Sequence, residues 1–312
     1  MHTPILIMIV GPTAVGKTAV SIRLAQHFST EIVSADARQF YQEMTIGTAK
    51  PTAEELQQVR HHLVDFLPVR QPYDVKQFEH DALRAIQQIH ARRPYAIATG
   101  GSGLYVQTLV RGIDEMPEVP AIIRQGLQQR WQQEGLLPLL AELQQVDPHY
   151  FAEVDQRNHR RVLRALEVYH STHRPYSSFR RPTQGVTRPF RTLTIGLCRP
   201  REILYQRIDQ RVDAMIAQGL IAEAQALYPW RNYQALRTVG YQECFPVVDG
   251  EYDVDEAIRL IKRNSRRYAK RQLTWFRKDS TICWFDVSLG MTQTVQNIIA
   301  HIKDATALTS QT

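Results

Sequence analysis

The chain has 312 residues, 43% hydrophobic and 22% charged, a balance that excludes a disordered protein and indicates a globular one with one or two domains. Its N-terminal apolar run is too short to span a membrane and no charged leader precedes it, so we expect a cytoplasmic protein without membrane association. Cys198, Cys244 and Cys283 form no CxxC pair, which argues against a zinc site or a disulfide framework. The net charge of +7 suggests a polyanionic partner.

An N-terminal segment carries the pattern of a phosphate-binding loop. Residues 11–18, Gly-Pro-Thr-Ala-Val-Gly-Lys-Thr, match G-x-x-x-x-G-K-[ST] at every fixed position. They follow the apolar run Ile5–Val10, typical of a buried parallel strand, and precede apolar residues at helical spacing. The two glycines let backbone N–H groups converge on phosphate oxygens, Lys17 adds a positive charge, and the Thr18 hydroxyl can bind Mg²⁺. The pattern predicts a bound phosphate group but identifies neither the compound nor the reaction.

The first third of the chain continues with alternating strand and helix patterns. We expect strands at 31–35, 63–66 and 95–99, and a helix over 74–90. This alternation predicts an α/β fold, a P-loop NTPase-like parallel sheet covered by helices. The polar stretch 36–51 is expected to be an active-site loop. Because the phosphate-binding loop, Asp36 and Gly100–Gly103 all follow strand ends, they should meet where such sheets bind ligands.

The character of the chain changes after Gly112. Prolines and helical apolar patterns dominate 113–189, which we expect to be a helical insertion domain, while 1–112 and 190–312 form the core that carries the P-loop. The later core elements are expected to be a strand at 192–198, a helix from 204 that is interrupted at Gly219, a basic helix over 255–276, a strand at 281–285 and a closing helix.

Several polar residues are candidates for chemistry. Asp36, at a strand end beside the phosphate site, could ligate a metal through water or accept a proton, although a turn-capping carboxylate is the alternative. His61 and His62 would point apart on a strand, which favours hydrogen-bonding structural roles over a metal site. Arg207 and Arg211 lie one helical turn apart, where either could meet a diphosphate or form a surface salt bridge.

The helix after Asp255 is rich in positive charge. Its apolar residues fall on one stripe, so the basic residues share the opposite face: Arg259, Lys262, Arg263, Arg266, Arg267, Lys270, Arg271, with Arg277 and Lys278 beyond it. A second basic set lies in the insertion: Arg157, Arg160, Arg161 and Arg164. Acids are absent from the first set and aromatics interleave with it, which favours nucleic-acid binding over a solvated face.

Motifs in order along nearly the whole chain resemble those of bacterial tRNA dimethylallyltransferases, also called tRNA isopentenyltransferases. Besides the P-loop, they are Asp36–Tyr41 (D-S-x-Q-V-Y), Ile46–Pro51 (I-G-T-A-K-P), His61–Asp65 (H-H-L-I-D), Gly100–Tyr105 (G-G-T-x-L-Y), Arg160–Val168 (R-R-V-I-R-A-L-E-V) and Ala269–Phe276 (A-K-R-Q-x-T-W-F). Two of the departures from these patterns concern hydroxyl side chains: Ala37 replaces the usual Ser, and Ser102 replaces the usual Thr.

The resemblance implies transfer of a dimethylallyl group from its diphosphate to the exocyclic amine of the tRNA adenosine just 3′ of the anticodon. Asp36 would be the general base, and the Ser102 hydroxyl would donate to the bridging oxygen. Mg²⁺ would assist as cofactor, held by Thr18, and we expect a monomer. The implied diphosphate-binding residues are Gly11, Thr13, Ala14, Val15, Gly16, Lys17, Thr18 and Arg211. The implied tRNA-binding residues are Asp36, Ala37, Arg38, Gln39, Ser102, Arg124, Arg160, Arg161, Arg164, Arg237, Gly240, Tyr241, Lys270 and Arg271.

Three other functions remain open on the residues alone. A P-loop kinase or NTPase for a small molecule would leave the basic helix unexplained. A prenyltransferase for free adenine nucleotides would leave the arginines of the insertion unexplained. A non-catalytic RNA-binding protein would not need the intact Lys17, Thr18 and Asp36.

Overall fold

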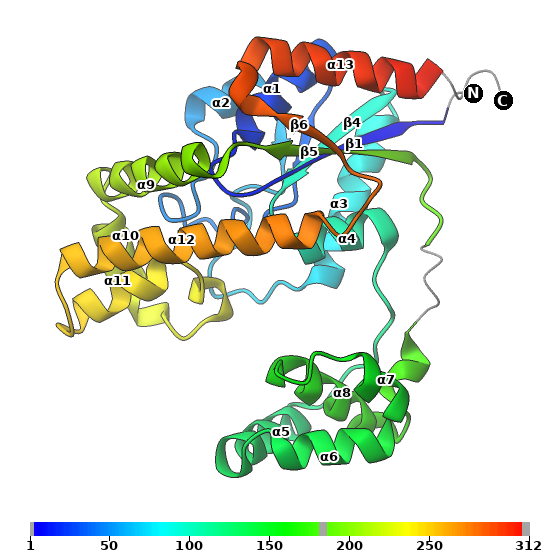
Figure 1. Ribbon diagram of the computed structural model, residues 1–312, viewed down its shortest axis with the longest axis vertical. Helices are drawn as coiled ribbons and strands as arrows, with labels where there is room; N and C mark the ends of the chain where they lie inside the picture. The colour runs from blue at the N-terminus through cyan, green and yellow to red at the C-terminus, as the bar shows by residue number, and fades with distance from the viewer. Residues whose placement is uncertain (1–2, 181–185, 308–312) are drawn as a thin grey trace. The chain divides into compact units, whose positions relative to one another are not determined.

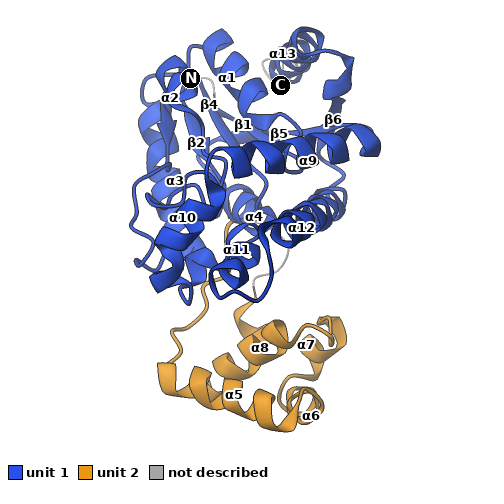
Figure 2. Cartoon of the chain, turned by 90° about the vertical axis from the view of Figure 1, so that its left-hand side faces the viewer, with its two compact units in different colours: residues 1–111, 188–312 blue, residues 112–187 orange. Residues whose placement is uncertain are grey.

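The computed structural model describes residues 3–180 and 186–307. The chain divides into two compact units, residues 1–111 with 188–312 and residues 112–187 (Figure 2). The expected boundaries lay after residues 112 and 189. The discontinuous unit holds the phosphate-binding loop, and the other unit is inserted into it.

A parallel sheet forms the centre of the larger unit. Within the described residues its six strands lie in the order β3-β2-β4-β1-β5-β6, and each neighbouring pair is parallel. The strands are β1 (Ile5–Val10), β2 (Ile32–Ser34), β3 (His61–His62), β4 (Tyr95–Gly100), β5 (Arg191–Cys198) and β6 (Cys283–Asp286). The expected α/β architecture is therefore confirmed.

Helices cover both faces of this sheet (Figure 1). The helices of the larger unit are α1 (Lys17–His27), α2 (Ala53–Gln58), α3 (Val75–His90), α4 (Gly103–Arg111), α9 (Arg201–Ala217), α10 (Leu220–Leu227), α11 (Tyr241–Val248), α12 (Val254–Phe276) and α13 (Met291–Ala307). Successive residues of β1 point to opposite faces, so Leu6 and Met8 join one hydrophobic cluster with α3 and α4, whereas Ile7 and Ile9 join another with α1 and α13. Both faces of the central strand are thereby buried.

One predicted strand is misplaced. The strand expected at 63–66 is the two-residue β3, His61–His62, and it stops there because Leu63 and Asp65 have positive φ values of 59° and 61°. The two histidines do have the expected structural hydrogen bonds: His61 Nδ1 lies 2.8 Å from the Val59 carbonyl, and His62 Nε2 lies 2.6 Å from Glu31 Oε2.

Three short helices, α2, α4 and α11, were not predicted. The sequence does carry a signal for α2, because Thr52 and Glu55 form the capping box that starts it. No helix within residues 3–180 and 186–307 is long and apolar enough to cross a membrane.

The inserted unit is helical, as expected. It contains α5 (Ala121–Glu134), α6 (Leu137–Val146), α7 (Pro148–Glu153) and α8 (His159–Thr172) around its own apolar cluster. The buried Asp147 caps α7 through the N–H of Tyr150 at 3.0 Å and accepts hydrogen bonds from the Ser177 N–H and hydroxyl, both at 2.7 Å. This unit therefore has a core and polar links of its own.

Candidate active site

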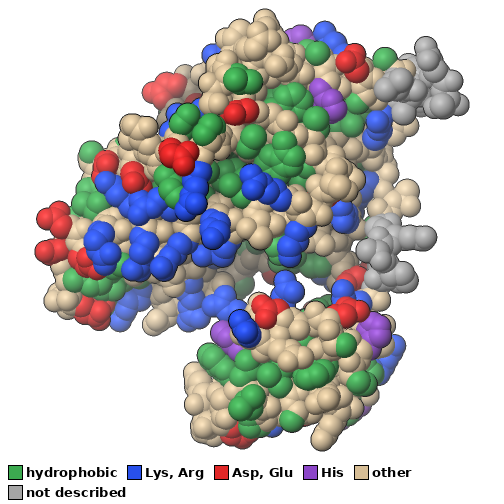
Figure 3. Space-filling view, in the orientation of Figure 1, with side chains coloured by type: hydrophobic (Ala, Val, Ile, Leu, Met, Phe, Trp, Pro, Cys, Tyr) green, Lys and Arg blue, Asp and Glu red, His purple; other side chains and the backbone are tan. Residues whose placement is uncertain are grey.

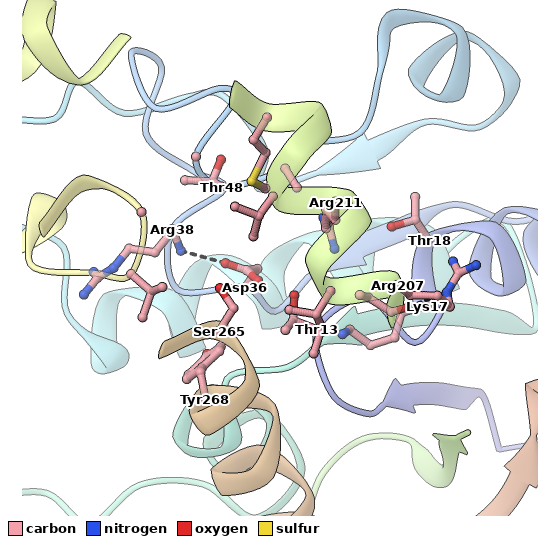
Figure 4. A pocket seen from close by; sticks show the side chains of 18 of the residues that line it. Thr13, Lys17, Thr18, Asp36, Arg38, Thr48, Arg207, Arg211, Ser265 and Tyr268 are labelled. Carbon is pink, nitrogen blue, oxygen red and sulfur yellow. Dashed lines mark hydrogen bonds between the residues drawn. The ribbon is translucent and has the colours of Figure 1, made fainter. Parts of the chain in front are cut away.

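A cavity of about 540 Å³ is lined by residues that follow the ends of β1 and β2 and by side chains of α9 and α12 (Figure 4). Its polar lining includes Thr13, Lys17, Thr18, Asp36, Arg38, Thr48, Arg207, Arg211 and Tyr268. The structure thus brings the P-loop and Asp36 to one site.

The P-loop adopts a backbone that its glycines make possible. Gly11, Ala14 and Gly16 have φ values of 150°, 61° and 114°. A Cβ on Gly11 would lie only 2.7 Å from the Leu197 carbonyl oxygen, so no larger residue fits there. The loop ends where α1 begins, at Lys17, and the unpaired N–H groups and dipole of this helix end favour an anion.

Two half-buried cations, Lys17 and Arg211, line the phosphate end of the cavity. Burial, opposed by the charge of Asp36, lowers the pKa of Lys17 to about 8, and Arg211 lowers it as well. The Lys17 ammonium donates to the carbonyls of Gly11 at 3.0 Å and Pro12 at 2.9 Å. Burial likewise lowers the pKa of Arg211. An anionic ligand would relieve the desolvation of both cations.

Arg207, one turn before Arg211 on α9, also belongs to this end. It lines the cavity, and its Nε donates to the Ala14 carbonyl at 2.9 Å. Arg199, which the sequence did not mark, donates its Nε to the next carbonyl of the loop, Val15, at 2.9 Å. Two arginines of one segment thus fix adjacent peptides of the P-loop.

Asp36 stands between the P-loop and the opposite wall. One carboxylate oxygen accepts the N–H of Arg38 at 2.9 Å, so the turn-capping role considered as an alternative is present for that oxygen. The side chain nevertheless lines the cavity, and its charge acts on Lys17 and Arg211. A carboxylate can cap a turn with one oxygen and accept a proton with the other.

Ser102 lies beside Asp36 but is not part of the cavity wall. Its Oγ accepts the N–H of Ala37 at 3.0 Å, and its side chain is hydrogen-bonded to Tyr268. Burial and the charge of Asp36 raise the pKa of Tyr268 to about 12, so Tyr268 remains a neutral hydroxyl at neutral pH.

The oxygen donors of the cavity fit a particular kind of metal site. Within the described ranges no group of three or more His, Cys, Asp and Glu residues could hold a metal ion. The Thr18 hydroxyl and the Asp36 carboxylate, however, line the same cavity as the P-loop. Mg²⁺ commonly takes one or two protein oxygens and completes its shell with water and substrate phosphates, so these residues suit Mg²⁺ bound together with a phosphate compound.

Comparison with known proteins identifies the family. Residues 39–279 match the family model described as IPP transferase. The tRNA dimethylallyltransferase of Cytophaga hutchinsonii is 46% identical over 90% of this chain and 92% of the relative. This chain belongs to the IPP transferase family.

Solved structures of IPP transferases agree with the fold. The full-length tRNA isopentenylpyrophosphate transferase from Bacillus halodurans is 38% identical, with a TM-score of 0.73 over 98% of both chains. A eukaryotic dimethylallyltransferase, captured acting on tRNA, is 27% identical, with a TM-score of 0.82 over 97% of this chain and 80% of that one.

The basic residues expected to bind tRNA differ in exposure in this IPP transferase. Exposed ones are Arg124, Arg160, Arg161, Arg237, Lys270 and Arg271. Arg164 is half-buried and pairs with Glu167 at 3.2 Å, whereas Arg38 lines the cavity. The side chain of Gln39 is used internally: its amide donates to the carbonyls of Thr48 at 3.4 Å and Ala49 at 3.1 Å.

Tyr241, which was expected to bind tRNA, has no exposed side chain to offer it. This side chain is fully buried, and its hydroxyl donates to Glu223 at 2.6 Å. Its neighbour Gly240, also expected to bind tRNA, lines the cavity. Tyr241 is buried because it begins α11, where its ring fills the space beside Gly47.

The basic face of α12 is more fully paired than the sequence indicated. Figure 3 shows Lys and Arg side chains gathered over α9 and α12. Two of them bond to acids of α9, Lys262 to Asp213 at 2.6 Å and Arg266 to Asp209 at 2.5 Å. Arg259, near the N-terminal end, is exposed but pairs with Glu256 at 2.5 Å. The other exposed basic residues lie toward the C-terminal end: Arg267, Lys270, Arg271, Arg277 and Lys278. Among the described residues of this basic set, the exposed cations not paired with an acid on their own helix therefore gather at the C-terminal end.

Besides Arg199, sequence reasoning missed two further residues that hold the site together. The buried amide of Gln272 accepts the N–H of Thr13 at 2.8 Å and donates to the Gly101 carbonyl at 2.8 Å, joining the P-loop to the turn after β4. Its place in the Ala269–Phe276 motif was the available signal. Glu223 binds the loop after β2, and nothing in its local sequence marks it.

Proposed function

We propose that this chain transfers a dimethylallyl group from dimethylallyl diphosphate to the exocyclic amine of the tRNA adenosine immediately 3′ of the anticodon, releasing diphosphate. Its relatives carry the name tRNA dimethylallyltransferase, and the eukaryotic neighbour acts on tRNA. The observation that carries the proposal is that a phosphate-binding loop, two half-buried cations and a carboxylate all face one cavity of about 540 Å³.

Each residue then has a role in a balanced displacement. The amine nitrogen forms a bond to the first carbon of the dimethylallyl group, and the bond from that carbon to the diphosphate oxygen breaks. The amine proton passes to Asp36, and the diphosphate leaves with the bonding electron pair. The P-loop amides, Lys17 and Arg211 stabilise the negative charge that grows on the leaving group. The Ser102 hydroxyl, which lies behind the cavity wall beside Ala37, would have to turn toward the cavity to donate to the bridging oxygen.

Thr18 would hold Mg²⁺ together with the diphosphate oxygens. The ion would supply positive charge to the same leaving group. The exposed arginines of α5 and α8, with Lys270 and Arg271, would bind the tRNA backbone, and the adenosine must leave its stack to reach the cavity. We expect the protein to act as a monomer.

Incubation with labelled dimethylallyl diphosphate and Mg²⁺ tests the proposal, with tRNA, AMP or neither as acceptor. We expect label in tRNA, full transfer without ATP, and competition by inorganic diphosphate. Label in AMP alone would indicate a prenyltransferase for free nucleotides. A strict requirement for ATP with release of phosphate would indicate a P-loop kinase or NTPase.

A further inference from the structure

Three consecutive backbone N–H groups in the loop after β2 converge on one carboxylate. The half-buried Glu223 of α10 accepts the N–H of Thr45 at 3.0 Å, of Ile46 at 2.8 Å and of Gly47 at 3.0 Å. An ionised carboxylate is the side chain best suited to accept several N–H groups at once. The orientation of three successive peptides is therefore set by a residue 176 to 178 positions away in sequence.

The Tyr241 hydroxyl is a fourth donor to Glu223. We call the Glu223 carboxylate, together with this hydroxyl and the N–H groups of Thr45, Ile46 and Gly47, the anchor. The Tyr241 hydroxyl donates to Glu223 Oε1 at 2.6 Å, and burial together with the charge of Glu223 raises the pKa of Tyr241, so the hydroxyl keeps its proton. The ring also packs on Gly47, where a Cβ would lie 2.6 Å from it. Backbone and side chain thus hold the loop against α10 and α11.

The anchored loop is a wall of the cavity away from the phosphate end. Gly47, Thr48 and Ala49 line the cavity. In Figure 4, Thr48 and Arg38 lie apart from Lys17 and Thr18. None of the four groups that donate to Glu223 belongs to the P-loop.

We infer that Glu223 is a positioning residue for the acceptor: its carboxylate, together with the Tyr241 hydroxyl, fixes the wall at Gly47–Ala49 against which the tRNA adenosine is held. This inference rests on the proposed function. Binding of the donor diphosphate, at the other end, does not depend on the anchor. A displacement of about 1 Å in a positioning element can cost roughly 10²-fold in rate, so a change confined to this wall should appear in the acceptor step.

Glu223→Gln tests the inference, because the glutamine side chain has the same shape but no charge. Its NH2 group replaces one carboxylate oxygen and cannot accept the backbone N–H groups that bond to that oxygen. We expect kcat/KM for tRNA to fall by roughly 10²-fold. The Kd of inorganic diphosphate should stay within about twofold of wild type, and amide hydrogen exchange in residues 42–50 should become faster. Glu202→Gln, an exposed glutamate on α9, serves as the control. Tyr241→Phe removes one donor and should produce a several-fold effect of the same kind.

If Glu223→Gln weakens tRNA binding and diphosphate binding equally, the anchor only stabilises the folded protein as a whole, and the inference is wrong. An unchanged kcat/KM for tRNA would overturn it as well. If Glu223→Gln does not fold, Tyr241→Phe decides between the same outcomes. A wild-type protein that modifies no tRNA would overturn the proposed function, whereas the exchange rates of residues 42–50 would still decide whether the anchor exists.

Discussion

The phosphate end of the cavity is formed mainly by one contiguous segment, whereas the opposite wall is assembled from distant ones. At the first end, the P-loop leads directly into α1. At the second, residues 45–47 are held by Glu223 of α10 and Tyr241 of α11. A local motif can evolve and be recognised as a unit, but a wall held from elsewhere depends on the whole fold.

The comparison implies that the two ends can be damaged separately. Changes at the P-loop should affect the donor, and changes at the opposite wall should affect the acceptor, with Asp36 between them. The following substitutions and conditions test this separation.

Asp36→Asn should have the largest effect, because Asn keeps an oxygen that can accept the Arg38 N–H but cannot take the amine proton. Single-turnover transfer should fall by roughly 10²–10⁴-fold, the usual contribution of a positioned general base. Both Kd values should change much less. A variant with a normal single-turnover rate would show that Asp36 only caps its turn.

Lys17→Ala should weaken the donor end alone. Loss of a cation that stabilises the leaving group should reduce kcat by roughly 10²–10³-fold and weaken diphosphate binding in calorimetry. The Kd for tRNA should be spared, and Lys17→Arg is the control that retains the charge. Loss of tRNA binding in the folded Lys17→Ala variant would mean that the ends are not separable.

Gly47→Ala should damage the other end. The added Cβ would lie 2.6 Å from the Tyr241 ring, so the loop or the ring must move. We expect a loss of about 1–3 kcal/mol in unfolding free energy. The control Gly126→Ala, inside helix α5 where a Cβ meets nothing within 4 Å, should cause no loss, because Ala favours a helix over Gly. Transfer to tRNA should fall by roughly 10-fold while diphosphate affinity is kept. Equal damage to both affinities would contradict the separation.

The pH dependence of diphosphate binding should show the loss of the positive charge on Lys17. Because burial lowers the pKa of Lys17 to about 8, its positive charge is present below that pH and is lost as the pH rises through it. Diphosphate affinity measured from pH 7 to 9 should therefore fall above about pH 8, by at most about tenfold per pH unit. Lys17→Arg should remove this decline, and a decline that persists in the variant would belong to another group.

Salt dependence should change least, and only for tRNA. Each phosphate contact contributes about 0.7–0.9 to the slope of log affinity against log salt. The double changes of Arg161 with Arg164, or of Lys270 with Arg271, should flatten the slope. The control pair is Arg84 with Lys303, exposed residues of α3 and α13. If neither tested pair alters the slope, those basic residues are merely solvated.

The sequence predicted the features that depend on neighbouring residues, as at the phosphate end, and missed those that depend on distant residues, as at the opposite wall. The P-loop, Asp36 and the strand–helix alternation depend on neighbouring residues, and their patterns are periodic or local. Gln272 and Thr13 are 259 positions apart, and Glu223 and Ile46 are 177 apart, so no local pattern relates them. The burial of the Tyr241 side chain could not be predicted for the same reason, because it depends on the distant Gly47. The strand at 63–66 was displaced because the positive φ of Leu63 leaves no mark on an apolar, β-prone run.

Helix α12 gives these distant contacts a common spacing. Asn264 donates to Glu243 of α11 at 2.7 Å, Arg266 pairs with α9, and Gln272 bonds to the P-loop and Gly101. A helix rises about 1.5 Å per residue, so Asn264 and Gln272, eight residues apart, are held about 12 Å apart along the helix axis. Inserting one residue between them would turn Gln272 by about 100° away from the P-loop. The number of residues between these positions of α12 therefore sets the distance between the parts of the cavity wall that they hold. The loops around the cavity can vary in length more freely than this helix can.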